Sequence, residues 1–291
     1  MRHLATVVVL TSVLGLPSPA SGQGNSAAHG HGHEGGITAG AAADATPLPA
    51  SGDGSRAFGV WLDDASVAAP GGGWATLSFG YYKTDGFREV DVPVADAGIG
   101  FTRRVQAGFF VPVYNVTPIG GTRAHGMGDV YLHGKVQLRD PGTAADGVGY
   151  ALVPIVEVTR EPIAGQSKVN WALPLAIEVR RSGWRCYGSG GYFSRGSLFG
   201  SMAVERPVTS KLSLTGTVSD SFATKMLPNE PPTLPRSRAD VSGGASYSMG
   251  PSLIVFGSIG RTISAHEATS TNLALSGGVA LNMAAPKRTA R

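Results

Sequence analysis

The sequence has a single cysteine, few charged residues and no long apolar run beyond its N-terminal stretch. Among 291 residues only Cys186 is a cysteine, which excludes an intramolecular disulfide and a metal site built from several cysteines. After the N-terminus, no apolar run approaches the ~18–20 residues that a membrane-spanning helix needs. Charged residues make up 15% of the chain and glycines number 42. This composition favours an all-β protein.

The sequence also lacks the common catalytic motifs. It contains no G-x-S-x-G, no H-E-x-x-H, no G-x-x-x-x-G-K-[ST] and no full G-x-G-x-x-G. Outside the N-terminal region the only histidines are His125, His133 and His266, and spacing assigns none of them a serine or acid partner. We therefore expect no enzymatic activity and no cofactor. The net charge of +4 is mild, and no basic face with interleaved aromatics indicates nucleic-acid binding.

The first 22 residues have the pattern of a cleaved export signal. Arg2 and His3 precede an apolar stretch over 4–16, and small residues then provide cleavage positions just before Gln23. No cysteine lies there, so a lipid anchor is not expected. The pattern predicts export across the inner membrane of a bacterial cell.

The leader over 23–56 consists mainly of Ala, Gly, Ser, Asp and Pro, and we predict that it is disordered. His29, His31 and His33 alternate with glycine within it. Alternating imidazoles can chelate Zn, Cu or Ni, so these histidines are candidate metal ligands. The alternative is a soluble linker with incidental metal affinity. A short basic tail over 284–291 ends the chain.

From Trp74 onward, short segments alternate between apolar and polar residues with a period of two, which indicates β-strands. Most are ~9–14 residues long, and transmembrane strands need ~9–11. The segments lie near 74–82, 88–101, 104–115, 127–139, 147–159, 168–180, 184–193, 198–206, 210–221, 236–248, 252–263 and 269–282.

The two faces of these segments differ in chemistry. Over 169–179, Trp171, Leu173 and Leu175 share one face with two further apolar residues, while the other face carries small or polar residues. A soluble β-sandwich shows similar alternation. The export signal, the strand lengths and the small inner-facing residues together favour an antiparallel transmembrane β-barrel over 57–283, with about twelve strands and 10–14 possible.

The connections alternate in length, as outer-membrane barrels require when the N-terminus is periplasmic. Short connections fall in even places, at Arg103-Arg104, Ser182-Gly183, Pro207–Ser210 and Gly250-Pro251. Long connections fall in odd places, at Thr117–Gly126, Glu161–Ser167, Ala223–Arg236 and Ser264–Thr269.

Three groups of residues carry further expectations. Prolines within strands predict bulges, kinks or strand ends, at Pro112, Pro154 and Pro174. Charges within strands should face the lumen or lie near the rim, either to guide a solute or to form a stiffening ion-pair network: Asp91, Asp129, Lys135, Glu157, Glu178, Arg180, Asp220 and Asp240. Aromatics near strand ends suit interfacial girdles, with ordinary core packing as the alternative: Trp74, Tyr81, Tyr82, Tyr114, Tyr131, Trp171, Trp184, Tyr192, Phe193 and Phe199.

The stretch GMGDVYLHGKVQLRD begins with Gly126, Gly128 and Asp129. It resembles the Gly-x-Gly-Asp signature of the outer-membrane family labelled "meta-pathway of phenol degradation", which is described as transporter-like. The resemblance covers most of 74–283 and implies a barrel that passes small, aromatic or hydrophobic compounds. We expect the three motif residues to serve the hairpin turn and the rim.

The sequence therefore predicts an outer-membrane barrel that forms a passive or gated path for small molecules, with membrane lipid and a small solute as partners. Two alternatives remain. One is a non-transporting structural barrel with the histidine tract as a metal-binding element. The other is a soluble periplasmic β-sandwich.

Overall fold

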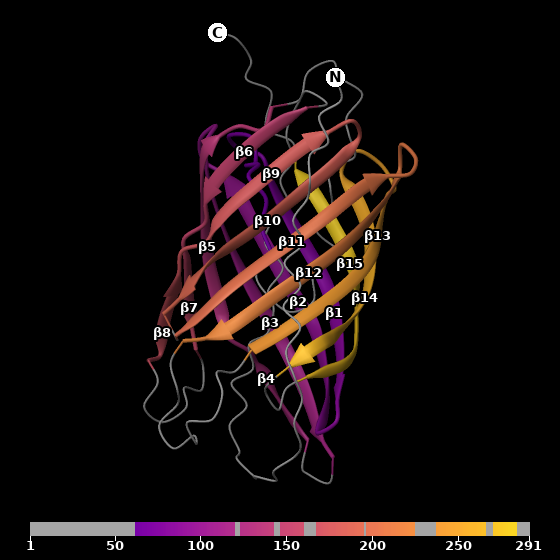
Figure 1. Ribbon diagram of the computed structural model, residues 1–291. Helices are drawn as coiled ribbons and strands as arrows, with labels where there is room; N and C mark the ends of the chain where they lie inside the picture. Colours follow the sequence, from indigo (N-terminus) through magenta and orange to yellow (C-terminus); the bar gives the residue numbers. More distant parts are fainter. Residues whose placement is uncertain are drawn as a thin grey trace, which may run out of the picture.

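The computed structural model describes residues 62–119, 123–142, 146–159, 167–194, 196–224, 237–265 and 270–283. These residues form fifteen β-strand segments in one sheet. The first segment, β1 (Gly73–Thr84), pairs antiparallel with the last, β15 (Thr271–Met283), so the sheet closes into a barrel (Figure 1). Among the described residues, no helix is long and apolar enough to cross a membrane.

The fifteen segments make up twelve strands that form the barrel wall. Nine of these strands are continuous and three are interrupted. The continuous strands are β1, β2 (Phe87–Gly100), β3 (Val105–Pro118), β10 (Trp184–Phe193), β11 (Ser197–Pro207), β12 (Leu212–Ala223), β13 (Ser237–Ser248), β14 (Leu253–Ala265) and β15. The interrupted strands are β4 (Ala124–Met127) with β5 (Val130–Arg139), β6 (Gly147–Leu152) with β7 (Ile155–Val158), and β8 (Val169–Ala172) with β9 (Leu175–Arg181). The predicted antiparallel barrel of about twelve strands is confirmed. The single closed sheet rules out the two-sheet sandwich.

Two of the interruptions coincide with prolines that the sequence predicts to disturb the wall. Pro154 separates β6 from β7, and Pro174 separates β8 from β9, because a proline nitrogen has no hydrogen to donate to the ladder. The neighbouring strands remain joined across both breaks. Gly134 N donates to Pro154 O at 2.8 Å, and Val153 N donates to Pro174 O at 3.0 Å.

The third interruption contains the Gly-x-Gly-Asp motif. Gly128 and Asp129 separate β4 from β5, and Gly128 N donates to Pro112 O on β3 at 2.8 Å. A Cβ at position 128 would lie 2.8 Å from Pro112 Cγ, so only glycine fits against this ring. Gly126 lies within β4 itself. The motif thus lies in and next to the short strand β4, where the chain enters the wall, rather than in the hairpin turn itself.

The connections separate into the two ends of the barrel. Four predicted short connections lie together at one end, at 101–104, 182–183, 208–211 and 249–252. The strand ends at the other end of the barrel are joined by ten residues at 159–168 and thirteen at 224–236, but by only five at 119–123 and 266–270, three at 194–196 and two at 85–86, so the predicted long connections are confirmed only in part. Ser182 and Gly183 adopt φ values of 49° and 81°, which a two-residue antiparallel hairpin requires.

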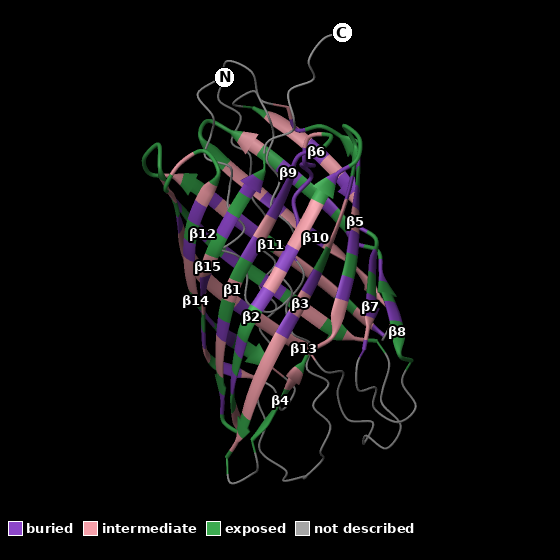
Figure 2. Cartoon of the chain, turned by 180° about the vertical axis from the view of Figure 1, so that it is seen from behind, coloured by how far each residue is buried: buried purple, intermediate pink, exposed green. Residues whose placement is uncertain are grey.

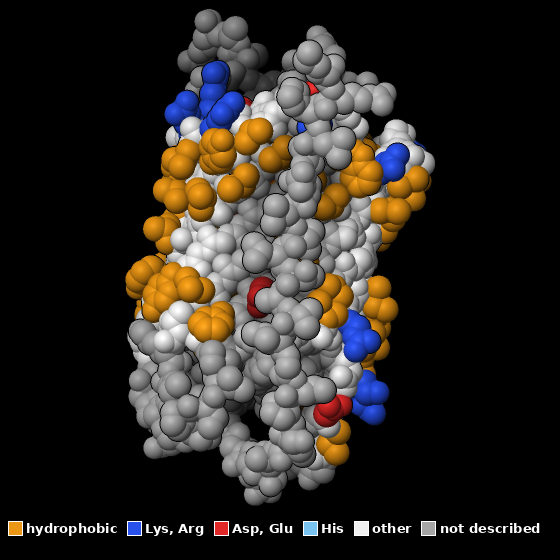
Figure 3. Space-filling model, viewed as in Figure 1, with side chains coloured by type: hydrophobic (Ala, Val, Ile, Leu, Met, Phe, Trp, Pro, Cys, Tyr) orange, Lys and Arg blue, Asp and Glu red, His pale blue; other side chains and the backbone are white. Residues whose placement is uncertain are grey.

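Buried and exposed residues alternate along many of the strands, as the colours of Figure 2 show, because successive side chains point to the inner and outer faces of the wall. On β9 the side chains of Leu175 and Ile177 are exposed on the outer face, whereas Ala176 and Glu178 are buried. On the face seen in Figure 3, hydrophobic side chains gather in an upper and a lower group with other residues between them, and Lys and Arg lie toward the two ends. The predicted assignment of apolar and polar faces is confirmed.

The aromatic residues do not all follow the predicted girdles. Trp171 and Trp184 are about half exposed on the outer face. Trp74 and Tyr131 instead are buried, because the alternation of their strands turns them toward the lumen. The girdle prediction is wrong for these two residues, and Phe193 and Phe199 also pack against a buried cluster in place of a lipid-facing girdle.

Candidate functional site in the barrel lumen

Residues 62–68, called the inner segment here, lie inside the barrel, and every one of them is buried. At one end of the segment, Pro70 bridges the last residue of β2. At the other end, Leu62 packs with Tyr187 of β10 and Ala203 of β11. Because β2 and β11 are the second and eighth of twelve spanning strands, the inner segment crosses the lumen from one wall to the opposite wall.

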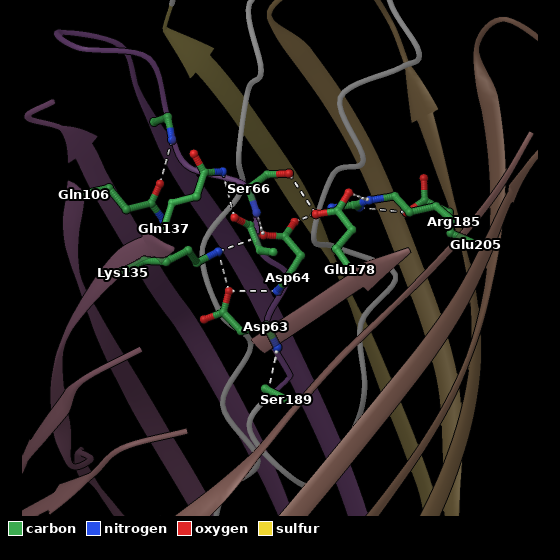
Figure 4. A network of polar contacts seen from close by, with 12 residues as sticks. Asp63, Asp64, Ser66, Gln106, Lys135, Gln137, Glu178, Arg185, Ser189 and Glu205 are labelled. Atoms are coloured by element: carbon green, nitrogen blue, oxygen red, sulfur yellow. Dashed lines mark hydrogen bonds and ion pairs between the residues drawn. The ribbon is translucent and has the colours of Figure 1, made fainter. Parts of the chain in front are cut away.

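Two adjacent carboxylates of the inner segment meet two cations of the wall (Figure 4). Lys135 Nζ on β5 lies 2.5 Å from Asp63 Oδ1 and 2.7 Å from Asp64 Oδ1. The other carboxylate oxygen of Asp64, Oδ2, contacts Arg185 Nη2 on β10. Asp64 therefore bridges Lys135 and Arg185 with one oxygen on each.

Glu178 on β9 extends this network. Its Oε1 accepts hydrogen bonds from Arg180 Nε at 2.7 Å and from Arg185 Nε at 2.8 Å. Its Oε2 accepts a hydrogen bond from Ser66 Oγ of the inner segment at 2.8 Å. Arg185 Nη1 also lies 3.3 Å from Glu205 Oε2 on β11. One connected set of charges thus joins the inner segment to β5, β9, β10 and β11.

Neutral hydrogen bonds also hold the backbone of the inner segment. Gln137 Nε2 on β5 donates to Ala65 O at 2.9 Å. Ala68 N donates to Gln106 Oε1 on β3 at 2.7 Å. These contacts satisfy backbone groups that have no partner strand, which is a requirement for a buried extended chain.

Because the charges are buried, the stability of each charged side chain in the network depends strongly on its partners. Lys135, Asp63 and Asp64 each have side chains only 1% exposed. Removing one partner from a buried ion pair typically costs ~3–5 kcal/mol, because it leaves an uncompensated charge. The inner segment and its wall partners therefore stabilise each other as one unit.

An apolar region adjoins the network. Ala65 of the inner segment packs into a cluster with Phe110, Tyr131 and Ile155, together with further small wall residues. The Tyr187 ring lies 4.4 Å from the guanidinium carbon of Arg185. The charged centre of the lumen is thus bordered by aromatic and aliphatic side chains.

The β12–β15 side of the lumen is chemically different. Buried and half-buried hydroxyls line it, and two pairs are within hydrogen-bond distance, Thr217 with Ser242 at 2.5 Å and Ser258 with Ser276 at 2.6 Å. Toward the long connections, Asp240 accepts hydrogen bonds from neighbouring side chains. The lumen thus combines polar surfaces with buried apolar clusters, and its cation-rich part lies beside the inner segment.

Most of the charged residues predicted to face the lumen or the rim do so, but Asp220 does not. Buried positions are held by Asp91, Lys135, Glu157, Glu178 and Asp240. Asp220 is exposed on the outer face, three residues before the end of β12. The contacts of Glu178 and Lys135 fit the predicted ion-pair network.

The other candidate residues are not brought into this site. His29, His31 and His33 lie outside the described residues, as do the predicted signal and the basic tail. The searched part of the chain contains no group of three or more potential metal ligands. His125 lies on β4, and not in a loop as expected. His133 is buried on β5, with its Nε2 3.5 Å from Asp96 Oδ1.

Sequence reasoning missed the inner segment. It placed the barrel domain over 57–283 and gave no role to Asp63, Asp64, Arg185 or Gln106. One signal was available: two consecutive acids stand among small and apolar residues just before the first strand. Such acids require cationic partners if the segment is buried.

The comparisons with known proteins concern the fold. No protein-family model matches the chain, and no curated protein matches it in sequence. The crystal structure of an outer membrane channel from Pseudomonas putida F1 superposes with a TM-score of 0.60 at 13% identity, covering 76% of this chain and 98% of that one. The NanC porin superposes with a TM-score of 0.51 at 7% identity, covering 71% of this chain and 98% of that one. The chain therefore has the fold of outer-membrane β-barrels.

Proposed function

We propose that this protein is a channel for small molecules in the bacterial outer membrane. The observation that carries the proposal is the closed barrel, which has an apolar outer face and a polar, charged lumen. An apolar outer face requires a lipid environment, and a closed sheet leaves no unpaired edge within it. Likeness in fold to an outer membrane channel and a porin supports the same role.

The short connections would face the periplasm and the long ones the outside, and the chain would arrive by a cleaved signal over 1–22. Residues Gly126, Gly128 and Asp129 support membership of the family labelled "meta-pathway of phenol degradation", for which aromatic or hydrophobic solutes are expected. In this assignment the motif has a structural role, because Gly128 fits against Pro112.

The lumen of a twelve-stranded barrel is intermediate in width. Barrels of ~8 strands are filled by side chains, whereas porins of 16–18 strands hold a water-filled channel. The inner segment crosses this intermediate lumen. We therefore propose a gated channel in which displacement of the inner segment opens the path. A non-transporting structural barrel is the second candidate, and the buried network that fills part of the lumen favours it.

Reconstitution of the full chain separates these candidates. Outer-membrane fractionation with heat-modifiable gel mobility should identify a folded barrel, and liposome swelling with a panel of small neutral and charged solutes should reveal solute-dependent flux. A barrel that folds into liposomes and passes no solute would support the structural role.

A double variant tests the gate directly. Leu62→Cys with Ala203→Cys, in a Cys186→Ser background, is designed to join the inner segment to β11 by a disulfide, because the two positions share one buried cluster. Flux should fall on oxidation and recover on reduction, while the Cys186→Ser protein alone should be insensitive to both treatments. Equal flux in the two redox states would show that the inner segment does not gate the channel.

A further inference from the structure

The wall of the lumen carries two cationic side chains whose spacing fits one carboxylate. In this structure the carboxylate of Asp64 occupies the position between them. The two oxygens of this one carboxylate are shared between Lys135, at 2.7 Å, and Arg185. The cations come from β5 and β10, so the wall itself positions them. Figure 4 shows the carboxylate lying between them, on a segment that is not part of the wall.

The charge balance around this site depends on the inner segment. Among the described residues, the network holds three cations, Lys135, Arg180 and Arg185, and the wall supplies two acids, Glu178 and Glu205. Asp63 and Asp64 add two further acids, so four acids face three cations when the segment is docked. Without the segment, two acids face three cations and the wall carries one excess positive charge.

Lys135 is the wall cation that depends most on the segment. Its described ion pairs are with Asp63 and Asp64, both of the inner segment. Displacement of the segment would leave this buried ammonium without these two partners. Two neighbouring wall cations, Lys135 and Arg185, then favour a replacement anion that forms charge-assisted hydrogen bonds with both.

The surroundings define the rest of the ligand. Apolar side chains border the site, including Tyr187 on the guanidinium of Arg185 and the cluster around Phe110 and Tyr131. An anion with a compact apolar body therefore fits better than a hydrated inorganic ion or a sugar acid.

We infer that Lys135 and Arg185 form a binding site for small organic monocarboxylates, and that the carboxylate of Asp64 is its internal competitor. The inference rests on the proposed function in one respect, because the inner segment must be displaceable. A solute that takes the place of Asp64 then favours the displaced state, since ligand and segment compete for the same two cations.

Calorimetric titration of the detergent-solubilised full chain tests the site without measuring transport. The probes are benzoate and its neutral analogue benzamide. In the double variant Asp63→Asn with Asp64→Asn, benzoate should bind at least ~10-fold more tightly than in the parent, because the competitor is removed. Benzamide should show no such gain, and adding Lys135→Gln should abolish the gain for benzoate.

Asp220→Asn and Lys211→Gln are matched controls, since each changes one charge at an exposed position away from the network. Neither should alter benzoate binding. Heat-modifiable mobility confirms that every variant is folded. A folded double variant that binds benzoate no better than benzamide, or a gain that survives Lys135→Gln, would overturn the inference.

A second measurement applies if the double variant does not fold. With an otherwise intact network, Leu62→Cys in the Cys186→Ser background reports displacement through its rate of maleimide labelling. Benzoate should accelerate labelling, whereas benzamide should not, and equal rates would overturn the inference. Benzoate binding without solute flux would refute the channel alone, and flux without benzoate binding would refute the site alone.

Discussion

A matched pair of arginine substitutions on β11 tests whether the barrel spans a bilayer as proposed. Met202 is the central residue of β11 and Leu198 its second residue. Both side chains lie on the outer face and are similarly exposed, at 52% and 49%. The two positions therefore differ chiefly in depth.

The depth difference follows from strand geometry. Four residues at ~3.4 Å each separate the positions by ~14 Å along the strand, which a tilt of ~40° reduces to ~10 Å in height. An arginine on the lipid face costs ~2–4 kcal/mol at the midplane and ~0–1 kcal/mol near the interface. Met202→Arg should thus lower the folding equilibrium constant by ~30- to 1,000-fold, and Leu198→Arg by less than ~10-fold.

The assay is equilibrium denaturant unfolding in phospholipid vesicles, followed by tryptophan fluorescence. Met202→Leu serves as the control for side-chain change at the same site, with an expected loss below ~1.5 kcal/mol. Equal losses for the two arginine variants, or a negligible loss for Met202→Arg, would refute the membrane position assigned to β11.

Two further predictions concern the wall and its charged network. Gly128→Ala should destabilise the barrel by ~1–3 kcal/mol in the same unfolding assay, because the new Cβ would lie 2.8 Å from Pro112 Cγ. Gly86→Ala is the control, and it should cost far less because a Cβ there has nothing within 4 Å. An equal loss of stability in the two variants would contradict the packing argument. Glu178→Gln should cost ~3–5 kcal/mol and speed proteolysis of the inner segment, since Arg185 loses a buried anionic partner. Unchanged stability and unchanged proteolysis would show that the network does not hold the segment.

The barrel wall was predictable because its signals are local. Each strand carries its own period-two alternation, and in β9 the alternation of Leu175 and Ile177 with Ala176 and Glu178 correctly assigned both faces. The effect of Pro154 was equally local, since it follows from the missing hydrogen of a single residue.

The inner segment was not predictable by the same means, because its partners are distant in sequence. Asp64 lies 71 residues from Lys135 and 121 residues from Arg185. No period in the segment records these contacts, and only the closed barrel brings the three side chains together. The lumen-facing position of Lys135 was expected, whereas the identity of its partners required the structure.

The aromatic residues show a limit of reasoning from position along a strand. Trp74 lies close to a strand end, as a girdle residue should, yet it is fully buried inside the barrel. Proximity to an interface and the face of the strand are separate properties. For Trp74, the alternation of the strand predicted the position of the side chain better than its proximity to the strand end.

The position of the inner segment also bears on how the barrel forms. The seam joins Gly73 to Met283, so β1 and β15 can meet only after the whole chain is available. The described polar partners of the inner segment lie on β3, β5, β9 and β10, which precede β11–β15 in the chain. Contacts of shorter sequence separation cost less chain entropy and tend to form first. The first half of the sheet can therefore curl around its own N-terminal segment while β11–β15 are still being added. In this order of events the barrel closes around a segment that is already in place, so no threading through a completed ring is needed.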